Sequence, residues 1–216
     1  MQLTFVTDEV ITITLLTELK NDAGYVIDLR HQLHRIAEVA HKEFRTTALI
    51  KEELGKLDLE LYDFGLETGV CALLRGSKPG PTIALRSDID ALPLKEETGL
   101  PFSSENDGVS HSCGHDVHAS ILLATARYLS HHRDEIAGNV WFYFQPAEET
   151  LTGAKALVNA GCLKQEPTPE SLLGFHTATS FEAGTFGIIR GPSNSGCDNF
   201  RITISSVGGH GATPHL

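Results

Sequence analysis

The stretch NVWFYFQPAEE, residues 139–149, decides the fold class. Its apolar and aromatic run is typical of a β-strand buried on both faces, and the proline at position 146 ends that strand. Three more stretches have the same apolar character: TGVCALLRG (68–76), PTIALRSDID (81–90) and SLLGFH (171–176). We expect SKPGP (77–81) to form the turn between the first two of them. The sequence therefore predicts several strands that share one buried sheet.

Helical patterns lie between these strands. Helical spacing of apolar residues, or helix start and stop signals, occur in four stretches: 24–41, 48–57, 116–130 and 152–161. Thr46 and Thr47 are the expected N-terminal caps of the second stretch. Gly161 is the expected C-terminal cap of the fourth. Strands that alternate with helices predict an α/β domain with a largely buried sheet.

The end of the chain has a different pattern. NFRITISSV, residues 199–207, alternates apolar and polar side chains, which is typical of a strand with one solvated face. It follows the turn-rich stretch RGPSNSGCD, residues 190–198. We therefore expect a second domain to begin near Gly191.

Composition limits the partners and the compartment. Seventeen basic and 28 acidic residues give a formal net charge of −11, which argues against nucleic acid or an anionic membrane surface as a main partner. No apolar run approaches the roughly 20 residues that span a bilayer, and the N-terminus lacks a secretory signal pattern. We expect a cytoplasmic protein whose scattered cysteines are thiols, with Cys113 set apart from the others by its polar neighbours.

Polar residues follow three of the predicted strands: Asp88 and Asp90, Glu148 and Glu149, and His176. In open α/β sheets, sites form just beyond the carboxyl ends of strands. A fourth polar cluster, HSCGHDVH (111–118), leads into the long helix. We therefore expect the four clusters to converge on one rim of the sheet.

These side chains are of the types that bind metals or move protons. Cys113 and His115 offer a thiolate and an imidazole, which zinc and similar metals prefer, and Gly114 lets the chain turn between them. The nearby helix N-terminus is expected to favour the thiolate. Glu148 and Glu149 point in different directions, so one could bind a metal while the other takes a proton from water. Each cluster alone could instead be a helix cap, a solvated turn or a hydrogen-bonded core histidine, but burying all of them without partners is costly.

Five motifs then occur in a fixed order: LRSDIDALPLKEETGLPF (85–102), HSCGHDVHA (111–119), FQPAEE (144–149), GFH (174–176) and GGHGATPH (208–215). This order resembles the aminoacylase, hippurate hydrolase and auxin-conjugate hydrolase family of metallopeptidase-like amidohydrolases, from about residue 27 onward. The resemblance implies a central mixed sheet flanked by helices, a phosphorylase/hydrolase-like zinc-peptidase domain. Residues 1–190 would be the N-terminal part of this metal-dependent catalytic domain. Residues 191–216 would begin an inserted α+β lid and dimerisation domain.

The resemblance also implies roles for individual residues. The metal ligands would be Cys113, His115, Glu149 and His176, with the thiolate between two divalent ions, either zinc or manganese, cobalt or nickel. Glu148 would be the general base, and Asp88 would orient the ligands. His210, from the lid, would polarise the scissile carbonyl across a homodimer. The implied reaction is hydrolysis of the amide bond of an N-acyl amino acid.

Two other interpretations remain open from the sequence. Members of this family continue beyond the GGHGATPH motif and supply one more histidine ligand, so the resemblance implies that activity depends on a further segment. A metal-binding protein that only associates with partners would also fit an incomplete ligand set. In the second interpretation, Cys113 is a thiol nucleophile with His115 as its base. The sequence does not indicate the acyl group, the amino acid or the metal.

Overall fold

A computed structural model describes residues 17–192, 196, 200–205, 208–213 and 215. The contacts divide the chain into two units, one that ends at Thr177 and one that runs from Ala178 to Leu216. All helices and strands of the described residues lie in the first unit. The expected domain boundary at residues 190 and 191 falls inside the second unit, and the identity of that unit as the beginning of a lid domain stays a prediction.

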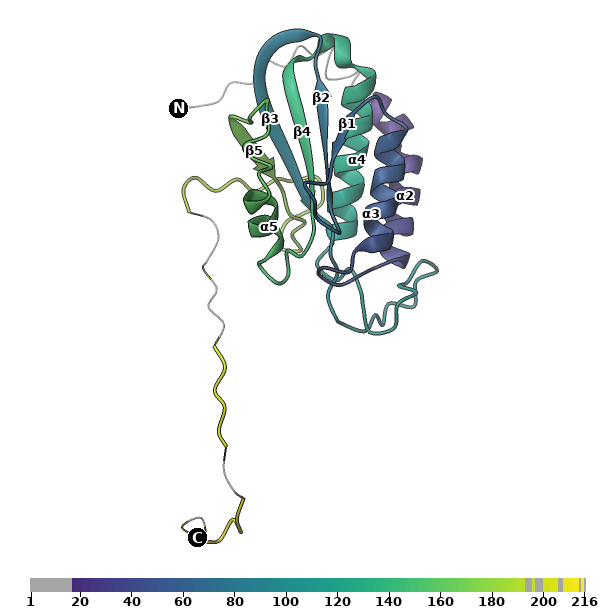
Figure 1. Cartoon of the computed structure of the whole chain (residues 1–216). Helices are drawn as coiled ribbons and strands as arrows, with labels where there is room; N and C mark the ends of the chain where they lie inside the picture. The colour runs from purple at the N-terminus through teal and green to yellow at the C-terminus, as the bar shows by residue number, and fades with distance from the viewer. Residues whose placement is uncertain (1–16, 193–195, 197–199, 206–207, 214, 216) are drawn as a thin grey trace. The chain divides into compact units, whose positions relative to one another are not determined.

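The first unit is a mixed sheet flanked by helices (Figure 1). Its elements are α2 (Ala23–Arg35), α3 (Phe44–Gly55), β1 (Glu60–Tyr62), β2 (Val70–Arg75), β3 (Lys78–Asp88), α4 (His115–His131), a 3₁₀ turn (Arg133–Glu135), β4 (Ala137–Gln145), α5 (Gly153–Asn159) and β5 (Ser171–Gly174). The strand order is β1-β2-β4-β3-β5. Strands β3, β4 and β5 are parallel, whereas β1 and β2 run antiparallel to their neighbours. This architecture confirms the expected mixed α/β fold, and no helix in the described residues is long and apolar enough to cross a membrane.

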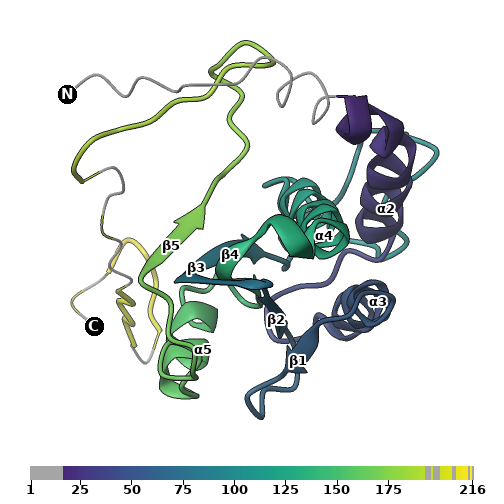
Figure 2. The ribbon, with the colours of Figure 1, turned by 90° about the horizontal axis from the view of Figure 1, so that it is seen from above.

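Both faces of the sheet are covered, because successive side chains of a strand point to opposite faces. Helices α2, α3 and α4 cover one face and α5 covers the other (Figure 2). The first face buries alternate residues of β2 and β4: Val70, Ala72, Leu74, Val140, Phe142 and Phe144. The second face buries the intervening ones together with a leucine of α5: Cys71, Leu73, Trp141, Tyr143 and Leu157. The two-sided burial explains why these strands are apolar almost throughout.

Helix α2 ends earlier than the sequence predicts. The helical spacing continues to residue 41, but α2 ends at Arg35. Beyond it, the carbonyl of Glu38 accepts a hydrogen bond from the amide of Ala91 at 2.8 Å, and Val39 forms an isolated parallel bridge with Ala91. These bonds to a distant segment replace the helical ones, so the prediction of a helix over 24–41 is wrong for its last six residues.

The predicted caps of the second helix are also wrong. Helix α3 begins at Phe44, so Thr46 and Thr47 lie inside its first turn. Both side chains are buried. The hydroxyl of Thr47 accepts a hydrogen bond from the amide of Gly69 at 2.9 Å, which ties α3 to the start of β2. Threonine is a suitable residue type for a helix cap, but here both hydroxyl groups bond to residues outside the helix, Gly69 and Glu38.

Two extended segments differ from the predictions. Strand β3 already begins at Lys78, which pairs with Ala137, so the connection between β2 and β3 is Gly76 and Ser77. The prediction of a turn over 77–81 is therefore wrong from Lys78 onward. The predicted strand over residues 199–207 is wrong for residues 200–205, which form no strand. Its remaining residues lie outside the described part of the chain. An alternating pattern needs a partner strand to become a sheet, and the described residues offer none there.

The parallel strands bring three chain segments to the same edge of the sheet. Asp88, the last residue of β3, pairs with Gln145, the last residue of β4. On the other side of β3, Arg86 pairs with Gly174, which ends β5. The segments that follow the three strands therefore start side by side, as the sequence predicts.

Strand β5 is one of the two outer strands of this sheet, and β1 is the other. Strand β5 pairs with β3 on one side and with no described strand on the other. Its side chains Leu172 and Leu173 are 53% and 65% exposed. The sheet therefore ends in an apolar, accessible strand.

The core under α2 yields a direct test of this packing. Leu33 of α2 is fully buried, whereas Ile27 on the same helix is 54% exposed. Leu33→Ala should lower the free energy of unfolding by about 2–5 kcal/mol, because it leaves a cavity in a closely packed core. Ile27→Ala is the matched control and should change it by no more than about 0.5 kcal/mol. Denaturant unfolding measures both, and equal effects would contradict the described orientation of α2.

Candidate metal centre

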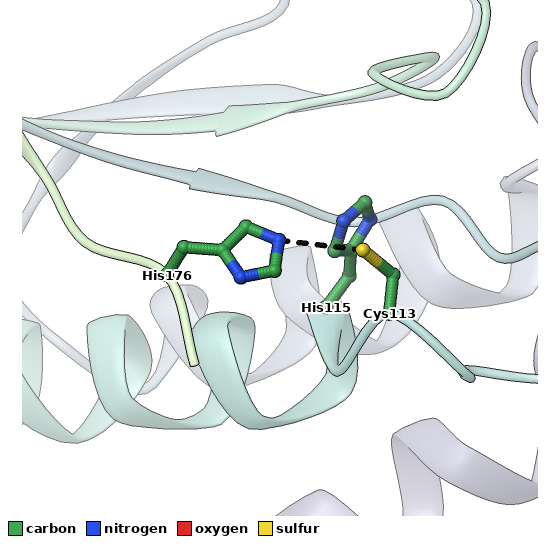
Figure 3. Close-up of side chains that lie close together, drawn as sticks. All are labelled: Cys113, His115 and His176. Carbon is green, nitrogen blue, oxygen red and sulfur yellow. Dashed lines mark hydrogen bonds between the residues drawn. The ribbon is translucent and has the colours of Figure 1, made fainter. Parts of the chain in front are cut away.

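The start of helix α4 carries the first two candidate ligands. Gly114 precedes the helix with φ +83°, a left-handed conformation that favours glycine. A Cβ atom there would lie 2.6 Å from the hydroxyl of Thr177, so the space is closed as well. This glycine turns the chain so that Cys113 and His115 face the same point, together with His176 after β5 (Figure 3). The Sγ atom of Cys113 lies 3.3 Å from Nε2 of His176.

Backbone carbonyls orient both of these imidazoles. Nδ1 of His115 donates to the carbonyl of Asp90 at 2.9 Å, and Nδ1 of His176 donates to the carbonyl of Thr177 at 2.7 Å. A carbonyl can only accept, so each ring carries a proton on Nδ1, and in its neutral form it presents the lone pair of Nε2. Nε2 of His115 is buried without a hydrogen-bond partner in the described part of the chain. Both rings are thus prepared to bind a cation through Nε2.

The two glutamates lie on the short loop between β4 and α5, residues 146–152, which we call the glutamate loop. Asp90 holds this loop, because its two carboxylate oxygens accept the amides of Glu148 and Glu149, each at 3.0 Å. One oxygen of Glu149 is buried without a partner among the described residues and lies 3.7 Å from Nε2 of His115. The Glu148 carboxylate is 4.0 Å from the same nitrogen and is the more exposed of the two, at 34% against 22%.

Asp88 lies behind this cluster. One of its oxygens accepts from Nδ1 of His118 at 2.6 Å, and the other accepts from Arg86 at 2.8 Å. Nε2 of His118 in turn accepts the amide of Thr177 at 3.0 Å, which fixes the tautomer of that ring. Burial opposes ionisation of Asp88, but the hydrogen bond from His118 and the nearby His115 and Arg86 hold its pKa at about 2.

The electrostatics of the cluster suit a cation. Three groups of potential ligands lie close together: Cys113, His115 and His176; His115, Glu148 and Glu149; and Asp88, His115 and His118. Burial, and then the nearby Glu149, raise the pKa of the Cys113 thiol to about 12. The expectation that the helix N-terminus favours the thiolate is therefore wrong for this chain without a cation, because burial and the carboxylates outweigh the helix. The cluster combines a soft sulfur donor with imidazole nitrogens and hard carboxylate oxygens. Such a set of donor atoms suits divalent metal ions.

The structure brings together six of the seven site residues expected from the sequence: Asp88, Cys113, His115, Glu148, Glu149 and His176. The seventh, His210, belongs to the second unit, where the amide of Thr213 donates to its carbonyl at 2.8 Å. Its role stays a prediction, as do the individual roles of the other six.

Sequence reasoning gave no role to Asp90 and His118. For each of these two residues, the spacing in the sequence could have indicated that it belongs to the site. Asp90 is two residues beyond Asp88 in an extended segment, and His118 is three residues beyond His115 on a helix, so each pair shares a side of the chain.

Similarity to known proteins extends over most of the chain. The model of peptidase family M20/M25/M40 matches residues 84–213. A thermostable carboxypeptidase of Saccharolobus solfataricus is 41% identical over 93% of this chain and 52% of its own length. An N-acyl-L-amino acid amidohydrolase of Geobacillus stearothermophilus is 40% identical over 93% of this chain and 53% of its own length. An N-acetyl-L-cysteine deacetylase of Bacillus subtilis is 40% identical over 88% and 45%.

A solved structure shows the same likeness. A Bacillus subtilis protein described as a dinuclear metal binding peptidase from the M20 family superposes with a TM-score of 0.71, at 40% identity. The superposition covers 74% of this chain and 44% of that one. This chain spans about half the length of the curated relatives that it matches. The matches confirm the resemblance that the motifs indicate, and the chain belongs to peptidase family M20/M25/M40.

Proposed function

We propose that this protein is a metal-dependent amidohydrolase that cleaves the amide bond of N-acyl amino acids of the hippurate or N-acetyl type. The observation that carries the proposal is the convergence of Cys113, His115 and His176 on one point beside Glu148 and Glu149. The names of the relatives, an N-acyl amino acid amidohydrolase and an N-acetylcysteine deacetylase among them, support this substrate class.

The proposed cofactor is a pair of divalent cations. Cys113, His115, Glu149 and His176 would hold them, with zinc favoured by the thiolate and manganese, cobalt or nickel as the other candidates. Cations held there would supply Lewis-acid chemistry, namely the activation of water and the polarisation of an amide carbonyl. The unpartnered lone pairs of His115 and Glu149 support this ligand set.

Glu148 is the proposed general base. Its carboxylate is held beside the cluster by the bond between its own amide and Asp90, but it is more exposed than that of Glu149. It is therefore the more accessible of the two carboxylates to a water molecule. In the proposed reaction, Glu148 takes a proton from the attacking water and later delivers it to the nitrogen of the leaving amine.

The parts outside this cluster are proposed on the motif resemblance. His210 would polarise the scissile carbonyl, and the working protein would be a homodimer. A location in the cytoplasm is also proposed, on the composition of the sequence.

A thiol nucleophile is the second candidate, because Cys113 contacts His176 at 3.3 Å. The raised pKa of this thiol disfavours it, since a nucleophilic cysteine needs a lowered one. One assay, the hydrolysis of N-acetyl and N-benzoyl amino acids, distinguishes the metal-dependent mechanism from the thiol nucleophile. A chelator abolishes a metal-dependent reaction and added metal restores it. Loss of activity to a thiol alkylator at unchanged metal content would favour the nucleophile.

Removal of a ligand should weaken metal binding. Cys113→Ala and His176→Ala should each raise the dissociation constant for Zn²⁺ or Co²⁺ more than the roughly 10–100-fold typical of losing a supporting hydrogen bond, because a direct donor is lost. Titration calorimetry and elemental analysis measure the effect. Cys162→Ala and His131→Ala remove the same residue types outside the cluster and should leave binding unchanged. Unchanged stoichiometry and affinity in the first two variants would contradict the ligand set.

Glu148→Gln should separate binding from turnover. The variant keeps the shape of the side chain but cannot accept a proton, so kcat in the metal-loaded protein should fall about 10²–10⁴-fold while metal content stays that of the wild type. Glu149→Gln is the matched neighbour and should lower metal content as well. Near-normal turnover in Glu148→Gln would refute its assignment as the base.

A further inference from the structure

We propose that Glu43 is a positioning residue, which holds the glutamate loop in the conformation that aims Glu148 and Glu149 at the metal centre. The inference rests on the proposed function of that loop. Glu43 lies in the linker between α2 and α3 and is completely buried. Its Oε1 atom accepts the backbone amide of Ala147 at 2.8 Å, across 104 residues of sequence.

Helix capping does not account for this carboxylate. Glu43 occupies the N-cap position of α3, where a short polar side chain usually accepts amides of its own helix, but it makes no such bond. Glu38 takes that role instead: its two oxygens accept the amides of Arg45 and Thr46, at 3.1 and 2.9 Å. The side chain of Glu43 is therefore directed away from the helix and toward the loop.

Burial of this carboxylate is costly, which indicates a specific role. Its second oxygen is buried without a hydrogen-bond partner in the described part of the chain. An ionised group in such a place loses its hydration and regains little, although the N-terminus of α3 offers a partial positive charge nearby. A core position without a polar task would be better filled by an apolar side chain.

The amide that Glu43 binds belongs to a strained residue. Ala147 has φ +51°, which is unusual for a residue with a side chain, and it is fully buried. In this conformation its carbonyl turns into the loop and accepts the amide of Gly153 at 3.1 Å. The bond from the amide of Ala147 to Glu43 holds the preceding peptide, so the peptide groups on both sides of this strained residue are fixed.

Two carboxylates together fix the loop. Glu43 accepts the amide of Ala147, and Asp90 accepts the amides of Glu148 and Glu149. Three successive amides therefore point inward to buried acceptors from two separate segments of the chain. The side chains of the two glutamates extend from this anchored backbone toward Nε2 of His115.

Two variants of similar shape separate the effect of the length of the Glu43 side chain from the effect of its charge. Glu43→Gln keeps an oxygen acceptor at the same distance but removes the charge, whereas Glu43→Asp keeps the charge but is one methylene too short. Glu38→Asp is the matched control, since it shortens a neighbouring carboxylate that serves α3 and not the loop. All three are compared with the wild type as the full 216-residue chain, with thermal unfolding recorded to correct for lost stability.

The first measurement is hydrogen–deuterium exchange in the metal-free protein, over a peptide that includes residues 147–149. Glu43→Asp should speed exchange there by at least about 10-fold, because the amide of Ala147 loses its acceptor and the loop opens locally. Glu43→Gln and Glu38→Asp should exchange like the wild type in this peptide. Wild-type protection in Glu43→Asp, or equal loss in Glu43→Gln, overturns the proposal.

The second measurement is the affinity for Co²⁺ or Zn²⁺ by titration. Glu43→Asp should weaken binding by about 10–100-fold, as is typical when a ligand loses its support, while Glu43→Gln and Glu38→Asp stay within about 3-fold of the wild type. Weakened binding in the control, equal to that in Glu43→Asp, would show a general loss of stability and overturn the positioning role. A wild type that binds no metal would refute the proposed function, whereas the exchange measurement would still decide the role of Glu43.

Discussion

The parallel pairing of β3 with β4 is the constraint on which the site depends. It aligns Asp88 with Gln145, so the segment that carries Asp90 lies next to the glutamate loop. The amides of Glu148 and Glu149 in that loop then donate hydrogen bonds to the carboxylate of Asp90, and these bonds position the side chains of the two glutamates. The core supports this register, because the residues of β4 alternate between two buried faces. A shift of one residue would turn Trp141 and Phe142 to the wrong sides and separate the acidic residues from their partners.

The same arrangement concentrates negative charge. Asp88, Asp90, Glu148 and Glu149 lie close to His115. Burial, and then Glu149, Asp88 and Glu148, raise the pKa of the nearby Cys113 thiol. In a protein interior such a set is unfavourable unless a positive charge compensates it. Arg86 offers one such charge, but it already forms an ion pair with Asp88. The electrostatic argument for cations thus stands on the carboxylates and is independent of the ligand geometry.

Much of the fold could be predicted from the sequence, because β2 and β4 are apolar almost throughout, as burial on both faces requires, and α4 has a long apolar pattern. Strand β5 is also apolar, although it is exposed. The convergence of the clusters could also be predicted, because parallel strands end at one edge. The end of α2 could not be predicted, because it depends on a hydrogen bond that the amide of the distant Ala91 donates to the carbonyl of Glu38. Nor could the use of Thr47, whose hydroxyl serves Gly69 and not its own helix. Glu43 has no local signal, because its partner lies 104 residues away.

The exposure of the outer strand β5 has a practical consequence. An accessible strand edge presents unpaired amides and carbonyls, and β5 adds exposed leucines on both of its faces. Such an edge is a template for pairing with any other extended chain, so purified preparations of these 216 residues should become turbid or form soluble aggregates as the concentration rises. Work at low concentration, or with a charged fusion partner, would protect the samples. His176 lies two residues beyond this strand, so the edge that endangers solubility also carries a proposed metal ligand.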